Sequence, residues 1–153
     1  MSNPSSLKDT IYKAILQDIL SYEYKPNDIL NEKALVEKYG MADRMVFNSF
    51  DAHVLEYVEE KWPGRYRLHG FYPYDIMANV VKNPDDYLYC ACIFDDRTPA
   101  HYDYLRQRGI EPWIGAGVLR SAHLQECAEN GAVMVCSNYP ADTVEKLKAL
   151  GLR

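Results

Sequence analysis

The sequence predicts an α/β protein: a partial (βα) barrel of about five parallel strand–helix units, preceded by an N-terminal helical segment. Three observations carry this prediction. From residue 44 onward, strand-like apolar runs alternate with helical patterns at intervals of about 20 residues. Runs such as "YLYCACIF" are apolar on both faces, as parallel strands covered by helices are. Several strands end in polar or aromatic residues, where functional groups gather in parallel α/β folds.

The N-terminal segment, residues 1–41, is predicted to hold two helices. Apolar residues recur on one helical face over residues 7–21, which predicts the first helix. The stretch "NEKALVEKYG" predicts the second helix, with Asn31 as its N-cap and Gly40 at its end. Pro26 and the polar residues after it separate the two helices.

Residues 42–153 are predicted to form the barrel part. The expected strands are residues 44–51, 64–73, 86–95, 110–118 and 132–140, and the expected helices are residues 52–62, 74–83, 99–109, 120–131 and 141–151. Five units do not close an eight-stranded barrel, so apolar runs such as "MVF", "YLYCACIF" and "VMV" should lie on an open face or edge. The sequence therefore predicts a homo-oligomer, in which the helix at residues 7–21 covers an edge within the chain or on a neighbour.

The composition limits the kinds of partner and the cellular location that can be expected. A net charge of −5 gives no reason to expect nucleic acid or an anionic membrane as the main partner. No apolar stretch approaches the roughly 20 residues of a membrane span, and "MSNPSSLKDT" has no signal-peptide core. The four cysteines have no Cys-x-x-Cys spacing. They are interpreted as reduced, buried thiols of a cytoplasmic protein and not as metal ligands.

Polar and aromatic residues at the strand ends are the candidate pocket. They are Ser49 and Phe50 after the first strand, His69 in the second, and Asn138 and Tyr139 after the last. Of the four histidines, only His69 lies at a strand end. The alternative is that each of these tips contains helix caps and turn formers.

The stretches "MVFNSFDAHVLEYV", "GIEPWIGAGV" and "NGAVMVCSNYPADTVEKLKALGLR" resemble the C-terminal half of glycerophosphodiester phosphodiesterases, over residues 33–153. Ser49-Phe50 matches the Ser-Phe pair of that family, and Tyr139-Pro140 matches its final Tyr-Pro. Asn138 stands where the family has Asp. Trp113 lies in the strand that carries the family's Trp, which adds it to the candidate pocket.

The chemistry of that family lies in its other half. A His-Arg pair, a Glu-x-Asp, an Asp-His and a Glu-x-Lys hold a divalent cation and supply the acid and base. None of these motifs occurs here in the family pattern. The resemblance therefore implies a domain that is inactive alone, without catalytic residues or a cofactor, and that binds a small phosphodiester or polyol. The alternative is an active hydrolase with a rebuilt or partner-supplied site.

Residues 7–41 resemble the first two helices of a GntR-type winged-helix regulator. The similarity covers the "Y-x-P-x-D-x-L" turn and "NEKALVEKYG". The recognition helix should follow, but only Arg44 and Val46 match it, and acidic residues outnumber basic ones over residues 1–41. DNA binding is therefore a second alternative, with a sensing domain attached. A competing interpretation places a recognition helix, a linker helix and a wing over residues 46–72.

Overall fold

The computed structural model describes residues 7–26, 28–29, 31–94, 97–115 and 120–152. The chain divides into two compact units, residues 1–42 and 43–153. None of the described helices combines the length and the apolar character that crossing a membrane requires.

The first unit holds α1 (Leu7–Leu20) and α2 (Glu32–Lys38). The predicted ends of α2 are confirmed. The Asn31 side chain accepts a hydrogen bond from the Ala34 amide at 3.2 Å, as an N-cap does. Gly40 follows the helix with a φ of +63°, in the left-handed conformation that glycine adopts without strain.

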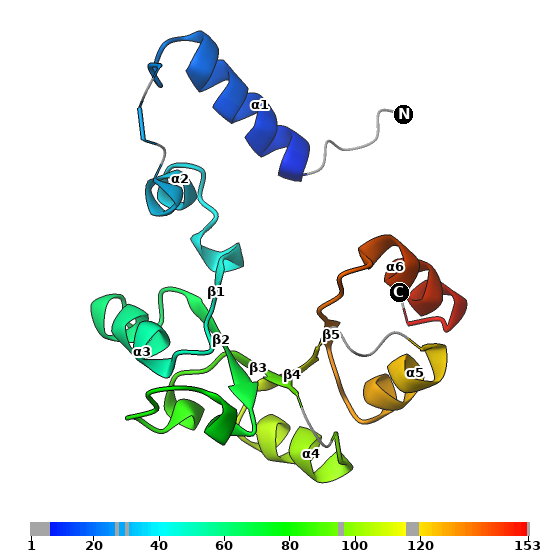
Figure 1. The fold of residues 1–153 in the computed structure, drawn as a ribbon. Helices are drawn as coiled ribbons and strands as arrows, with labels where there is room; N and C mark the ends of the chain where they lie inside the picture. Colours follow the sequence, from blue (N-terminus) through cyan, green and yellow to red (C-terminus); the bar gives the residue numbers. More distant parts are fainter. Residues whose placement is uncertain (1–6, 27, 30, 95–96, 116–119, 153) are drawn as a thin grey trace. The chain divides into compact units, whose positions relative to one another are not determined.

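The second unit contains a five-stranded sheet in which the strands follow one another in chain order. The strands are β1 (Val46–Asn48), β2 (Arg67–Tyr72), β3 (Cys90–Ile93), β4 (Glu111–Ile114) and β5 (Met134–Val135), and the helices are α3 (Ala52–Lys61), α4 (Pro99–Gln107), α5 (Ser121–Glu129) and α6 (Pro140–Ala149). Each strand pairs in parallel with the next. The sheet curls into half of a barrel (Figure 1), so the predicted fold class is confirmed.

The competing winged-helix interpretation of residues 46–72 is wrong. Those residues form β1, α3 and β2, and the two strands pair in parallel across the helix. A wing is a hairpin of antiparallel strands, which this register excludes. Where a recognition helix would begin, the chain forms a single 3-10 turn, Ala42–Arg44, and then enters β1.

The helix predicted over residues 74–83 is also wrong. Two short 3-10 turns, Tyr74–Ile76 and Pro84–Asp86, take its place. Between them Asn79 has a φ of 54°, which an α-helix does not allow. The other four predicted helices form, each within two residues of its expected bounds.

Backbone hydrogen bonds to neighbouring elements replace the missing helix. The Ala78 amide donates to the Phe50 carbonyl at 2.8 Å. The amides of Val81 and Lys82 donate to one carboxylate oxygen of Glu56, at 3.1 and 2.9 Å. Glu56 lies on α3 and is buried, so this carboxylate fixes the loop to the helix and satisfies donors that a helix would have satisfied internally.

Asp85 is the other anchor of this loop. Its carboxylate accepts hydrogen bonds from the hydroxyls of Tyr74 and Tyr104, at 2.6 and 2.9 Å, and from Arg108 Nε at 2.7 Å. Burial alone raises the pKa of Asp85, but these three hydrogen bonds outweigh it, so the pKa lies below its usual value. The guanidinium of Arg108 also lies over the Tyr104 ring, 3.5 Å from its centroid. The cluster joins the loop to α4.

We expect Asp85→Asn to lower the free energy of unfolding by about 2 kcal/mol, because the charged acceptor of three hydrogen bonds is lost from a mostly buried position. Asp103→Asn is the matched control. Asp103 makes an exposed pair with Arg106 one turn along α4 and should change stability by less than about 0.5 kcal/mol. Urea denaturation measures both, and equal values for the two variants would contradict the role of Asp85.

The two faces of the sheet differ in what covers them. Tyr72 contacts the rings of His101 and Tyr104 on α4, so its side of the sheet faces the helices. The opposite side is the inner face of the curled sheet. Side chains from neighbouring strands meet there, such as those of His69 and Trp113, whose ring centroids are 4.8 Å apart.

The expected exposure of "YLYCACIF" is wrong for its central part. All four residues of β3, Cys90–Ile93, are buried, because the curl of the sheet packs inner side chains of neighbouring strands against one another. The exposure expected for "VMV" is confirmed for its first two residues: Val133, just before β5, is 60% exposed, and Met134, in β5, is 48% exposed.

Candidate functional site

His69 lies at the centre of the inner face. The register pairs it with Asn48 on β1 and with Cys90 on β3. Only 3% of its surface is exposed. The Asn48 side-chain amide forms a hydrogen bond with His69 Nδ1, and the ring tautomer decides which of the two groups donates. The other ring nitrogen, Nε2, is buried and has no hydrogen-bond partner among the residues that the structure describes.

Burial also fixes the charge of this ring. Desolvation lowers the pKa of His69 from 6.5 to about 4, so the imidazole is neutral at physiological pH. A neutral imidazole has one N–H donor and one acceptor nitrogen and offers no positive charge to an anion.

Aromatic side chains surround His69. Its ring centroid is 4.8 Å from that of Trp113 and 5.2 Å from that of Phe71. Trp113 Nε1 donates to Glu111 at 3.1 Å, and the Tyr89 hydroxyl donates to the other oxygen of the same carboxylate. Both oxygens of Glu111 therefore have partners, and this carboxylate serves to orient the indole.

Three phenylalanines form the rim above His69. Phe50 stacks on Phe71 with a centroid distance of 3.6 Å and an interplanar angle of 3°. Phe94 stands edge-on to both, at 5.8 and 6.0 Å. Phe50 and Phe94 are 48% and 46% exposed. They come from the carboxyl ends of β1 and β3, so the rim presents apolar surface to solvent at the end of the sheet where ligands bind in such folds.

The remaining sequence candidates lie elsewhere or have structural partners. Ser49 Oγ accepts from the Asp51 amide at 2.9 Å and shapes the turn into α3. Asn138 and Tyr139 are exposed, and within the described residues no hydrogen bond or ring contact joins their side chains to the candidates on the inner face. Arg44 is exposed before β1.

The polar tip after β5 begins the last helix. Ser137 Oγ accepts from the Tyr139 amide at 3.0 Å and pairs with Thr143 Oγ1 at 2.7 Å. Thr143 lies in the first turn of α6 and is buried. This hydroxyl pair therefore organises the helix start, which is the alternative that the sequence left open for such tips.

The structure thus brings together Phe50, His69 and Trp113 from the predicted set. It adds Asn48 and Phe71, which sequence reasoning did not select. A signal for them was present, because residues two apart on a strand share a face. Asn48 is two residues before Phe50, and Phe71 is two residues after His69.

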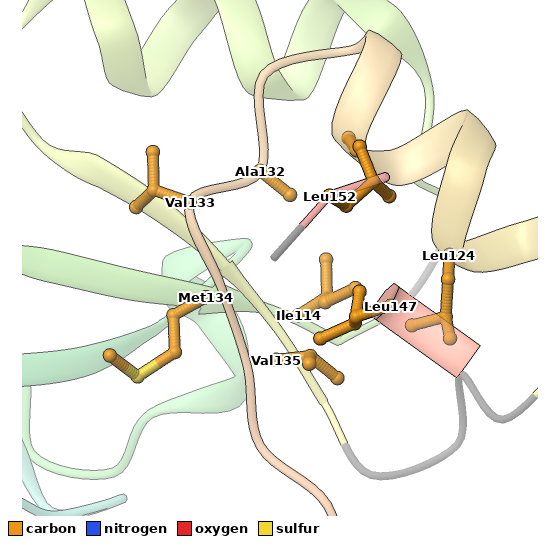
Figure 2. A pocket seen from close by; sticks show the side chains of 9 residues that line it. Ile114, Leu124, Ala132, Val133, Met134, Val135, Leu147 and Leu152 are labelled. Atoms are coloured by element: carbon orange, nitrogen blue, oxygen red, sulfur yellow. The ribbon is translucent and has the colours of Figure 1, made fainter. Parts of the chain in front are cut away.

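A second feature is an apolar groove beside β5, shown in Figure 2. Its volume is about 680 Å³, and its lining consists of Ile114, Leu124, Ala128, Ala132, Val133, Met134, Val135, Leu147 and Leu152. All of these side chains are apolar. In Figure 2, Val133 and Met134 point away from the cluster formed by Ile114, Leu124 and Leu147. Within the described chain β5 pairs only with β4, so its other edge is open.

Among the residues that the structure describes, no group of three histidine, cysteine, aspartate or glutamate side chains is arranged to hold a metal ion. The four cysteines are free. Burial raises the pKa of the Cys90 thiol, and it raises that of Cys92 to about 12, so both are protonated at neutral pH.

Because His69 is buried in its neutral form, acid should destabilise the fold through this residue. Between pH 6.5 and about 4, the unfolded chain binds a proton at His69 and the folded chain does not, so the free energy of unfolding falls as the pH falls. The full effect is about 3 kcal/mol, because lowering a pKa by one corresponds to about 1.4 kcal/mol. Urea denaturation at several pH values should show that His69→Gln removes this dependence.

The control for that measurement is His53→Gln. His53 is exposed on α3 and should leave the slope unchanged. An identical pH slope in wild type and His69→Gln would show that other groups cause the acid sensitivity.

Comparison with known proteins gives fold relatives only. No family model matches the chain, and no curated protein is similar enough to count as a relative. A crystal structure described as a glycerophosphoryl diester phosphodiesterase of Silicibacter pomeroyi superposes with a TM-score of 0.60 and 19% identity, over 78% of this chain and 43% of the other.

Two further crystal structures, both described as glycerophosphodiester phosphodiesterases, are similar. The one from Galdieria sulphuraria has a TM-score of 0.59 and 18% identity, over 76% of this chain and 48% of the other. The one from Parabacteroides distasonis has a TM-score of 0.57 and 12% identity, over 97% of this chain and 56% of the other. The chain thus spans about half the length of these proteins, and at these identities the likeness concerns the fold.

Proposed function

We propose that this chain is a glycerophosphodiester phosphodiesterase-type domain that lacks the catalytic, metal-binding half of the barrel and binds a small ligand without hydrolysing it. The supporting observation is a half-barrel that superposes on three proteins described as such enzymes while spanning about half of each. The Ser49-Phe50 and Tyr139-Pro140 matches lie in this same half. The catalytic motifs of the family are absent from the sequence.

The chemistry of the inner face favours a polyol over an anionic diester. His69 is neutral, so its ring has no positive charge with which a phosphate could pair. The charged group beside it, Glu111, is an acid. The rings of Trp113 and Phe71 provide apolar walls. Hydroxyl oxygens and C–H groups of a polyol match this set, whereas a phosphate anion would lie beside the Glu111 carboxylate and a neutral His69.

We expect the purified chain to show no Mg²⁺- or Ca²⁺-dependent hydrolysis of glycerophosphocholine. Calcium takes about 6–8 oxygen ligands, and the family's carboxylate motifs that would supply them do not occur in the sequence. Release of choline or glycerol 3-phosphate is measured with each cation and with EDTA. Turnover that EDTA abolishes and that survives repurification would favour the alternative, an active hydrolase with a rebuilt or partner-supplied site.

We also propose that the chain forms a homo-oligomer through the open edge of β5. The groove beside this strand is lined by apolar residues, and Val133 and Met134 expose much of their surface at this end of the sheet. An unpaired strand edge with apolar neighbours is stabilised by pairing with another copy. A stable interface buries about 1,600 Å² in total.

Sedimentation equilibrium should therefore show a dimer or larger species at micromolar concentration. The double variant Val133→Glu, Met134→Glu should dissociate it with little loss of monomer stability, because both side chains are already largely exposed in one chain. Val81→Glu is the matched control, since Val81 is 80% exposed in the loop before β3. A folded wild-type monomer at about 100 μM would contradict the proposal.

The regulator resemblance of residues 7–41 gives no second candidate function. The segment after α2 forms a 3-10 turn and β1, and Arg44 is the sole candidate for a DNA contact that the sequence offered there. Specific DNA complexes rest on several base and phosphate contacts from one recognition element. We therefore propose that any DNA binding is weak and nonspecific.

A further inference from the structure

The sequence contains one Asn-Gly dipeptide, Asn130–Gly131, and it lies at the junction between α5 and β5. An asparagine side chain can react with the backbone nitrogen of the residue that follows it. Glycine hinders this approach least, because it has no Cβ. Asn130 is half-buried, and its side-chain amide forms no hydrogen bond with another residue that the structure describes. Rotation of this side chain toward the Gly131 nitrogen therefore breaks no hydrogen bond.

The fold requires glycine at position 131. Gly131 has a φ of +98°, in the left-handed region. The guanidinium of Arg106, on α4, packs against it, and a Cβ on Gly131 would lie 3.0 Å from Arg106 Nη1. Any other residue would be strained and would have to displace Arg106. The structure therefore keeps the least hindered neighbour directly after Asn130.

Two hydrogen bonds close this end of α5. The Gly131 amide donates to the Ala128 carbonyl, and the Ala132 amide donates to the Cys127 carbonyl, both at 2.9 Å, as in a Schellman motif. Asn130 has a helical backbone, with ψ at −5°. Attack on its side chain needs a different ψ and a free Gly131 amide, so this turn must open first. Helix ends open locally, at a lower free energy than the whole fold.

We propose that Asn130–Gly131 is a site of spontaneous deamidation, with opening of the α5 end as the gating step. The Gly131 nitrogen bonds to Asn130 Cγ, the Cγ–Nδ2 bond breaks, and ammonia leaves with the amide proton of Gly131. Water then opens the resulting cyclic imide. Cleavage of the bond to Cγ gives aspartate, and cleavage of the bond to the main-chain carbonyl carbon gives isoaspartate. The reaction consumes only water.

Both products change the connection to β5. Each places a carboxylate at the C-terminal end of α5, where the helix dipole is negative and Glu129 is the preceding residue. Isoaspartate also routes the main chain through the side-chain carbon, which lengthens the link between α5 and β5. The next residues, Ala132 and Val133, line the groove beside β5. Deamidation should therefore weaken self-association. This consequence rests on the proposed oligomer, whereas the modification itself does not.

The test is incubation of the purified full chain at physiological temperature and pH. Peptide mapping by mass spectrometry measures conversion at each asparagine, and an isoaspartyl methyltransferase labels isoaspartate. We expect Asn130 to be the main site, while Asn138, which is exposed and followed by Tyr139, stays intact. Urea concentrations that leave the chain folded should change the rate little, because opening of one helix end exposes little surface. Equal rates at Asn130 and Asn138, or conversion only where urea unfolds the chain, would overturn the proposal.

Two variants separate the chemistry from the gating step. Asn130→Gln should abolish the modification and keep the thermal midpoint of fresh wild type, because the longer side chain closes a larger, less favoured ring. Gln125→Ala removes the 2.9 Å hydrogen bond from Gln125 to Glu129 in the last turn of α5. It should speed deamidation about twofold, since pairs at this spacing stabilise a helix only slightly. An unchanged rate in Gln125→Ala would contradict the gating step.

Sedimentation equilibrium of fresh and aged protein measures the consequence for assembly. Aged wild type should dissociate more readily than fresh wild type, and aged Asn130→Gln should not. A fresh protein that is already monomeric would contradict the proposed oligomer, while the peptide map would still decide whether Asn130 is modified.

Discussion

The parallel register between β1 and β2 is the constraint on which the inner face depends. It sets Asn48 beside His69, so the Asn48 amide forms a hydrogen bond with one nitrogen of the buried imidazole. A slip of one residue would turn His69 toward the helices and bring Leu68 inward, because side chains alternate between the two faces of a strand. The aromatic rim above and Trp113 beside His69 follow from the same register, continued through β3 and β4.

Much of this fold was predictable because its signals are local. Strand–helix alternation reports the periodicity of short segments, and both N-terminal helices and four of the five barrel helices follow it. The helix over residues 74–83 failed for a reason that no local pattern contains. Its backbone donors find Glu56 and Phe50, which lie more than 20 positions earlier in the chain. Hydrogen bonds to distant parts of the chain therefore outweighed the helical propensity of residues 74–83.

The candidate site was predictable in part for the same reason. Strand ends can be located from sequence, which identified Phe50 and His69. Whether a polar residue at a strand end faces a ligand or caps a helix depends on its partners. Ser137 forms hydrogen bonds with the Tyr139 amide and with Thr143. The polar residues after β5, which the sequence offered as candidate site residues, therefore stabilise the start of α6. Asn48 was overlooked because its importance depends on its neighbour in the sheet. The register between two strands cannot be predicted from the sequence of one strand alone.

The strand order, β1 to β5 in chain order, has a consequence for how such a protein holds together. Every strand pairs only with the strands that precede and follow it among the described elements. A complete barrel closes by pairing its first strand with its last. This sheet needs no such contact. The unit at residues 43–153 therefore resembles a short linear array of strand–helix repeats, whose stability is the sum of each repeat and its nearest-neighbour interfaces. In a sheet built this way, the pairing of β1 with β2 involves no residue of β4 or β5.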